Sequence, residues 1–180
     1  MNDEGVISLP SFLRALKKSE TFSPILSQNV LLYSSESPEA DGVDFAHPRV
    51  IAFHENLILA LTGKVEDSNY GRVQIIEYLP KEGQFAFHEL DFRANAKPVI
   101  QDAPTSCVDC HHGRPIWSSY SLWPGAFGSN ADTTETSEFK HFGIKPTHDE
   151  RTKLREFLEK NAREIPYKHF DFQAFGPDHV

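Results

Sequence analysis

Basic residues, sulfur-containing residues and long apolar runs are all scarce in this chain of 180 residues. Lys and Arg total 18 against 26 Asp and Glu, which gives a formal net charge of −8. Proteins that bind nucleic acid need a basic surface to neutralise phosphates, so we expect no nucleic-acid partner. No apolar run approaches the ~18 residues of a membrane-spanning helix, so we expect no transmembrane segment. The opening residues are too polar for a signal peptide and show no export signal.

Length and composition favour a single folded domain. Hydrophobic residues make up 39%, and 14 Phe, 5 Tyr and 2 Trp supply large apolar side chains for a core. A chain of this length fits one domain. We therefore treat residues 1–180 as a single domain, with a sheet-rich part at 1–95 and a loop-rich and helical part at 96–180.

Hydrophobic periodicity predicts an α+β fold. Apolar residues at helical spacing predict a helix that begins at residues 9–11 and ends by 19–23, and a second helix over 147–161 follows a capping box. Runs rich in β-branched and aromatic residues predict about five strands, at 30–33, 49–53, 57–62, 72–79 and 84–92. The last four form two antiparallel hairpins, so we expect a small antiparallel sheet with a few helices.

The two cysteines stand at a spacing that has chemical meaning. Cys107 and Cys110 are followed at once by His111, which is the C-x-x-C-H pattern of covalent haem attachment. Two thiols three positions apart can add to the two vinyl groups of one porphyrin, and the adjacent imidazole can then bind the iron. The pattern predicts one haem c, linked through Cys107 and Cys110, with His111 as axial ligand. We expect the pair to lie among loops.

Three other interpretations of the cysteine pair stay open. A zinc site would normally have a second pair of ligands, and the nearest later histidines, His141 and His148, are seven positions apart. A thioredoxin-like dithiol would lie between a strand and a helix of a βαβ unit, whereas this pair follows β hairpins. Finally, the two cysteines could be structural or reactive residues without any cofactor.

The motif region resembles a group of bacterial c-type cytochrome-like proteins of uncharacterised activity. In these proteins a C-x-x-C-H-G-like core is followed by R-P-x-W and W-P-G-x-[YF]-G-S, and the matching segments here are 103–111, 113–117 and 122–129, with Tyr120 between them. A segment from Pro48 to Gly63 also resembles theirs, so that the similarity extends over about residues 10 to 170. The resemblance implies haem attachment through Cys107 and Cys110 with His111 as ligand, and no particular activity. The strands before the motif are unlike the all-α fold of small cytochromes c.

The second axial ligand of the iron has to come from a residue other than methionine. Met1 is the only methionine and lies at a chain end that is prone to fray, so Met/His ligation is not expected. The candidates are His88, which shares a strand face with Ala86 and Leu90, and the downstream residues His141 and His169. If none of them binds, the position is taken by another side chain or water, or it stays empty and the iron is five-coordinate.

Aromatic residues after the motif have two interpretations. Trp117, Tyr120, Trp123 and Phe127 could wall the porphyrin, while Arg114, with the Trp117 N–H or the Tyr120 hydroxyl, binds the propionates. The same residues could instead form a small core under an irregular loop. The sequence leaves both open.

Electron transfer with an unknown redox partner is the function that the motif favours. No Ser-His-Asp set, phosphate loop or paired-carboxylate pattern points to an enzyme. The alternatives are a five-coordinate haem protein that binds a small ligand or peroxide, and a zinc-stabilised interaction domain. Thioether attachment takes place outside the bacterial cytoplasm, so the haem-loaded protein would be periplasmic or exported, with a leader upstream of Met1, and the haem-free protein would be cytoplasmic.

Overall fold

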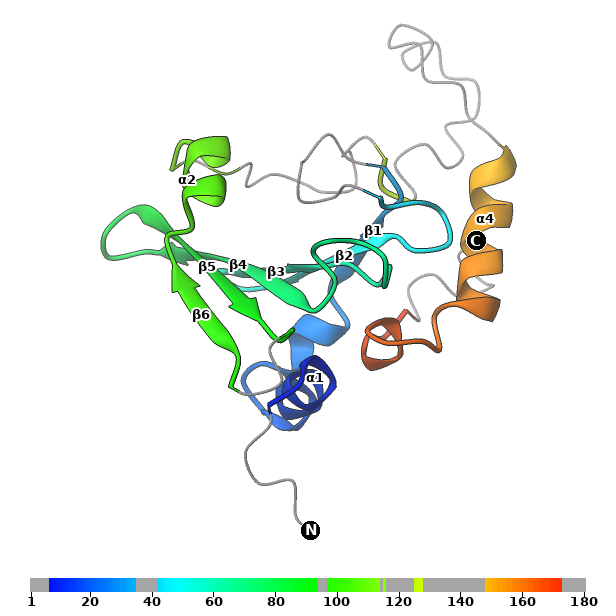
Figure 1. Cartoon of the computed structure of the whole chain (residues 1–180), viewed down its shortest axis with the longest axis horizontal. Helices are drawn as coiled ribbons and strands as arrows, with labels where there is room; N and C mark the ends of the chain where they lie inside the picture. The colour runs from blue at the N-terminus through cyan, green and yellow to red at the C-terminus, as the bar shows by residue number, and fades with distance from the viewer. Residues whose placement is uncertain are drawn as a thin grey trace, which may run out of the picture.

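The computed structural model describes residues 7–34, 42–93, 97–113, 115, 125–127 and 148–172. Its centre is a six-stranded antiparallel sheet in which the strands follow their sequence order (Figure 1). The strands are β1 (Asn29–Leu32), β2 (Arg49–His54), β3 (Leu57–Leu61), β4 (Arg72–Leu79), β5 (Gln84–Asp91) and β6 (Val99–Asp102). The α+β class is confirmed, and the number of strands is six rather than about five.

Helices and 3₁₀ turns flank the sheet. They are α1 (Leu9–Lys18), η1 (Ser23–Leu26), α2 (Thr105–His111), α4 (His148–Lys160) and η4 (Tyr167–His169). The two predicted helices are confirmed as α1 and α4. In α1 a capping box joins Ser8 to Ser11, where the Ser8 N–H donates to the Ser11 hydroxyl at 2.8 Å. The additional strand β6 and the helix α2 were not predicted.

The two faces of the sheet have different neighbours. On the first, which we call the core face, Leu31, Val50, Leu59 and Val73 pack with residues of α1, η1, α4 and η4 into the main hydrophobic core. On the second, the motif face, a smaller cluster forms around Ile51, Ile58 and Ala60. Figure 1 shows α1 and α2 on opposite sides of the sheet. The helix that carries the cysteine motif thus lies away from the main core.

Residues 125–127 extend the sheet at β1. Ala126 forms a β-bridge with Leu32, and the Phe127 N–H donates to the Leu31 carbonyl at 2.9 Å. The Phe127 ring is buried in the core, with its centroid 4.9 Å from that of Tyr33 and 5.8 Å from that of Phe45. Phe127 is therefore a residue of the main core next to β1, whereas the motif helix α2 follows β6 at the opposite edge of the sheet.

Candidate functional site

The cysteine motif forms a short helix directly after β6. The Ala103 N–H donates to the Phe87 carbonyl on β5 at 2.8 Å, and the N–H groups of Cys107 and Val108 both donate to the Pro104 carbonyl at 3.0 Å. The helix ends at His111, and its C-cap His112 has a left-handed φ of 48°. The expectation that the pair lies among loops is therefore wrong, because both cysteines lie within the helix α2, which follows the strand β6.

The thioredoxin-like alternative requires a strand and a helix around the cysteine pair. Both are present here. The surrounding sheet is nevertheless antiparallel throughout the described strands, whereas a βαβ unit needs two parallel strands joined by the helix. The cysteine pair therefore follows a strand and lies in a helix, but the described sheet lacks the parallel strand pairing that is typical of a thioredoxin-like dithiol.

The helical turn brings the three motif residues to one side of α2. Residues three and four apart on an α-helix are neighbours on its surface, which applies to Cys110 and His111 relative to Cys107. Cys110 is exposed, Cys107 is half-buried, and no disulfide joins them. Two thiols and an imidazole therefore face the same region, and solvent reaches the thiol of Cys110.

His111 packs against the motif face of the sheet through Phe87. The two rings stack with centroids 5.5 Å apart and an interplanar angle of 15°. Because the Ala103 N–H also donates to the Phe87 carbonyl, both ends of α2 are fixed to this one residue. Burial and then the positive charge of Arg49 lower the pKa of His111, which favours the neutral imidazole that metals bind.

The motif residues suit a haem better than a zinc ion. The haem needs two accessible thiols at this spacing and one neutral imidazole, and α2 presents them on one side. Zinc needs about four ligands, and the described part of the chain holds no cluster of three or more His, Cys, Asp or Glu side chains suited to a metal. The donor set is thus compatible with haem c, for which Cys107 and Cys110 would be the attachment residues and His111 the ligand.

The candidates for the second axial ligand do not gather at α2. His88 follows Phe87 in β5, so its side chain points to the core face, where its Nδ1 lies 2.6 Å from Asp102 Oδ1. His169 lies in η4, which packs against α1 on that same face. His141 is outside the described residues, as are the proposed propionate and wall residues Arg114, Trp117, Tyr120 and Trp123.

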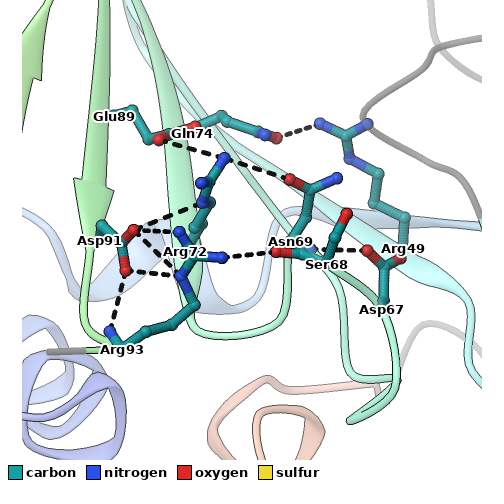
Figure 2. A network of polar contacts seen from close by, with 9 residues as sticks. All are labelled: Arg49, Asp67, Ser68, Asn69, Arg72, Gln74, Glu89, Asp91 and Arg93. Carbon is teal, nitrogen blue, oxygen red and sulfur yellow. Dashed lines mark hydrogen bonds and ion pairs between the residues drawn. The ribbon is translucent and has the colours of Figure 1, made fainter.

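A network of polar contacts lies beside Phe87 on the motif face and is drawn in Figure 2. Arg72 on β4 forms ion pairs with Glu89 and Asp91 on β5, at 3.5 and 3.4 Å. Arg93 donates to both carboxylate oxygens of Asp91, at 2.9 and 3.0 Å, and these hydrogen bonds hold the pKa of Asp91 below its usual value. At the other end of the network, the Arg49 guanidinium donates to Gln74.

His169 gives a prediction about stability and pH. Its Nε2 is buried and has no hydrogen-bond partner within the described structure. Burial, followed by the positive charges of Lys168, Arg14 and Lys17, lowers the pKa of His169. The folded chain therefore binds fewer protons at this site than the unfolded chain, so stability falls as the pH drops below about 6.5 and levels off below the folded-state pKa.

The comparison of the natural protein with His169→Gln isolates this contribution, because glutamine does not titrate. Urea denaturation at pH 7.5 and pH 5.0 should show a larger fall of the midpoint for the natural protein than for the variant. Equal falls in the two proteins would contradict the assignment of acid sensitivity to His169.

No protein-family model, curated protein or solved structure matches this chain. Within the part that the structure describes, none of the helices has the length and apolar character to cross a membrane.

Two residues of the site escaped the sequence reasoning. Phe87 supports α2 and His111, and Arg49 contributes positive charge beside them. The alternation of β5 carried a usable signal, because Phe87 and His88 must point to opposite faces of the sheet. The sequence analysis chose His88 as a ligand candidate, and the side chain of His88 points to the core face, away from α2. The role of Arg49 had a weaker signal, namely a charged residue at the start of an apolar strand.

Proposed function

We propose that this protein is a monohaem c-type cytochrome-like electron-transfer protein, with haem attached through Cys107 and Cys110 and ligated by His111. The observation that carries the proposal is the helical turn α2, which places both thiols and the imidazole on one side. The haem, when bound, supplies a one-electron iron couple. The chain holds the thiols accessible and orients the imidazole against Phe87.

Attachment requires no oxidant. Each thiol of Cys107 and Cys110 adds across a vinyl double bond: the sulfur bonds one vinyl carbon, and the thiol hydrogen ends on the other. Neither cysteine is in a disulfide, so both sulfur atoms are available for this addition. Because the reaction takes place outside the bacterial cytoplasm, the proposal includes an exported, periplasmic location and a redox partner protein.

The test is production of the full chain with an export leader and the cytochrome c maturation machinery. Denaturing electrophoresis with haem staining, followed by a pyridine haemochrome spectrum, measures haem that stays bound to the polypeptide. We expect one thioether-linked haem per chain. Protein recovered folded from the periplasm without covalent haem would refute the proposal.

A five-coordinate haem protein that binds a small ligand or peroxide is the second candidate. It is favoured by the positions of His88 and His169, both associated with the core face, whereas α2 and His111 lie at the motif face. The ferric absorption spectrum of the purified protein separates the two candidates. A high-spin spectrum supports the five-coordinate protein, and a low-spin spectrum supports a six-coordinate electron carrier.

A further inference from the structure

The strand β6 is an edge of the sheet whose side chains are exposed (Figure 1). Two of them are apolar, and the exposed fractions are 57% for Val99 and 65% for Ile100. At the opposite edge, residues 125–127 of the same chain form a bridge with β1, whereas β5 is the only described segment that pairs with β6. An edge strand with free backbone groups and exposed apolar side chains is a template for pairing with another strand.

The free backbone groups of β6 belong to two alternate residues. The Ala103 N–H donates to the Phe87 carbonyl on β5, so the alternation of an antiparallel ladder also directs the N–H and C=O of Gln101 toward β5. The N–H and C=O groups of Ile100 and Asp102 therefore point outward. Among the described residues, none of the hydrogen bonds involves these outward groups.

Prolines on both sides of β6 leave one register for full antiparallel pairing of this edge with an identical edge. When the two Gln101 residues lie opposite each other, Ile100 of each copy pairs with Asp102 of the other, and each pair exchanges both N–H···O bonds. A register centred on Ile100 would set Asp102 against Pro98, which has no N–H to donate. A register centred on Asp102 meets the same obstacle at Pro104. The edge is thus complementary to itself in a single, two-fold symmetric register.

We propose that this protein forms a two-fold symmetric dimer through antiparallel pairing of β6 with β6 of a second copy. The two sheets then form one continuous sheet, and the motif faces of both copies lie on the same side because the two-fold axis is perpendicular to the sheet. Val99 pairs with Asp91 and shares the motif face with Phe87. In the dimer Val99 lies opposite Ala103 of the other copy, just before that copy's α2. The proposal does not depend on haem.

The side chains of β6 also favour an identical partner. Each chain has a net charge of −8, so two copies repel each other unless the contact region is nearly neutral. The one charged residue of β6 is Asp102, and its carboxylate lies 2.6 Å from His88 Nδ1 of the same chain. At the axis, the two Gln101 amides can donate to and accept from each other. The two Ile100 side chains are diagonal neighbours within reach of contact.

The experiment is sedimentation velocity of the full chain over a range of protein concentrations, with two variants of Ile100. Ile100→Lys places two like charges beside the axis, and Ile100→Pro removes an outward N–H that the pairing with β5 does not use. Val65→Lys is the matched control, because Val65 is 66% exposed and lies outside β6. We expect the natural protein and Val65→Lys to sediment with twice the mass of one chain, and both Ile100 variants with the mass of one chain.

Covalent trapping tests the register. Gln101→Cys, in a background in which Cys107 and Cys110 are alanine, places two thiols opposite each other across the axis, close enough for a disulfide. Under mild oxidation it should run as a covalent dimer on non-reducing electrophoresis, while Val65→Cys in the same background stays a single chain. Equal cross-linking of the two variants would contradict the register.

The remaining outcomes also decide the matter. A natural protein that stays monomeric at every concentration overturns the dimer, and so does a monomer that instead retains a different protein at β6. A dimer that persists unchanged in both Ile100 variants shows that another surface forms it. Assemblies larger than a dimer contradict the closed two-fold arrangement. Circular dichroism of each variant establishes that a lost dimer is not a lost fold.

Discussion

Replacement of both Cys107 and Cys110 by alanine is expected to abolish covalent haem attachment completely. Neither cysteine is in a disulfide, and neither is a fully buried residue of the core, so the fold should survive their loss. The double variant leaves His111 stacked on Phe87, and only the thioether bonds disappear. Haem staining after denaturing electrophoresis should therefore fall to background, while the circular dichroism of the variant stays native.

The single variants make this result specific. Cys107→Ala and Cys110→Ala should each retain haem through the remaining thiol, with the pyridine haemochrome band shifted to longer wavelength because one vinyl group stays conjugated with the porphyrin. Ser106→Ala, an exposed neighbour on α2, is the matched control and should attach haem normally. Haem that remains on the denatured double variant would show that other residues hold it.

The sequence predicted those elements that carry a long periodic pattern. The helices α1 and α4 and the first five strands were found because their apolar residues repeat at helical or strand spacing. The strand β6 was missed because it has only four residues and its two apolar residues, Val99 and Ile100, are adjacent, so that no apolar alternation marks it. The helix α2 was missed because it has seven residues and none of them is buried.

The site divides in the same way between local and non-local information. The spacing of Cys107, Cys110 and His111 is local chemistry and can be read directly from the sequence. The neighbours of His111 depend on the register of β2, β4 and β5, which brings Arg49 and Phe87 to the same face. His88 illustrates the limit of prediction from the sequence. The strand face of His88 was predicted from alternation, but the side of the sheet on which α2 packs could not be predicted.

The largest expected effect on stability comes from Gly63, which follows β3. A Cβ atom at this position would overlap the Tyr167 ring, far inside van der Waals contact. Tyr167 is fully buried, its hydroxyl donates to the Pro48 carbonyl at 2.8 Å, and burial raises its pKa, so the hydroxyl keeps its proton. Gly63→Ala must displace this ring, and we expect a loss of about 3 kcal/mol, the upper end of the usual range for overpacking a core.

Gly83→Ala is the matched control, because nothing lies within 4 Å of its added Cβ. Gly83 has a φ of 64°, so alanine there should cost about 1–2 kcal/mol from the left-handed backbone alone. Urea denaturation measures both variants. A Gly63→Ala protein no less stable than Gly83→Ala would contradict the predicted displacement of Tyr167.

A double-mutant cycle then tests the contact itself. Tyr167→Leu removes the ring and its hydrogen bond to Pro48, and should be destabilising alone. In that background the added methyl group of Gly63→Ala meets no ring, so the second substitution should cost less than about 1 kcal/mol, and the two effects should be strongly non-additive. Additive losses would mean that Gly63 is required for a reason other than Tyr167. Non-additivity would show that the buried ring fixes the C-terminal segment, through η4, to the end of β3.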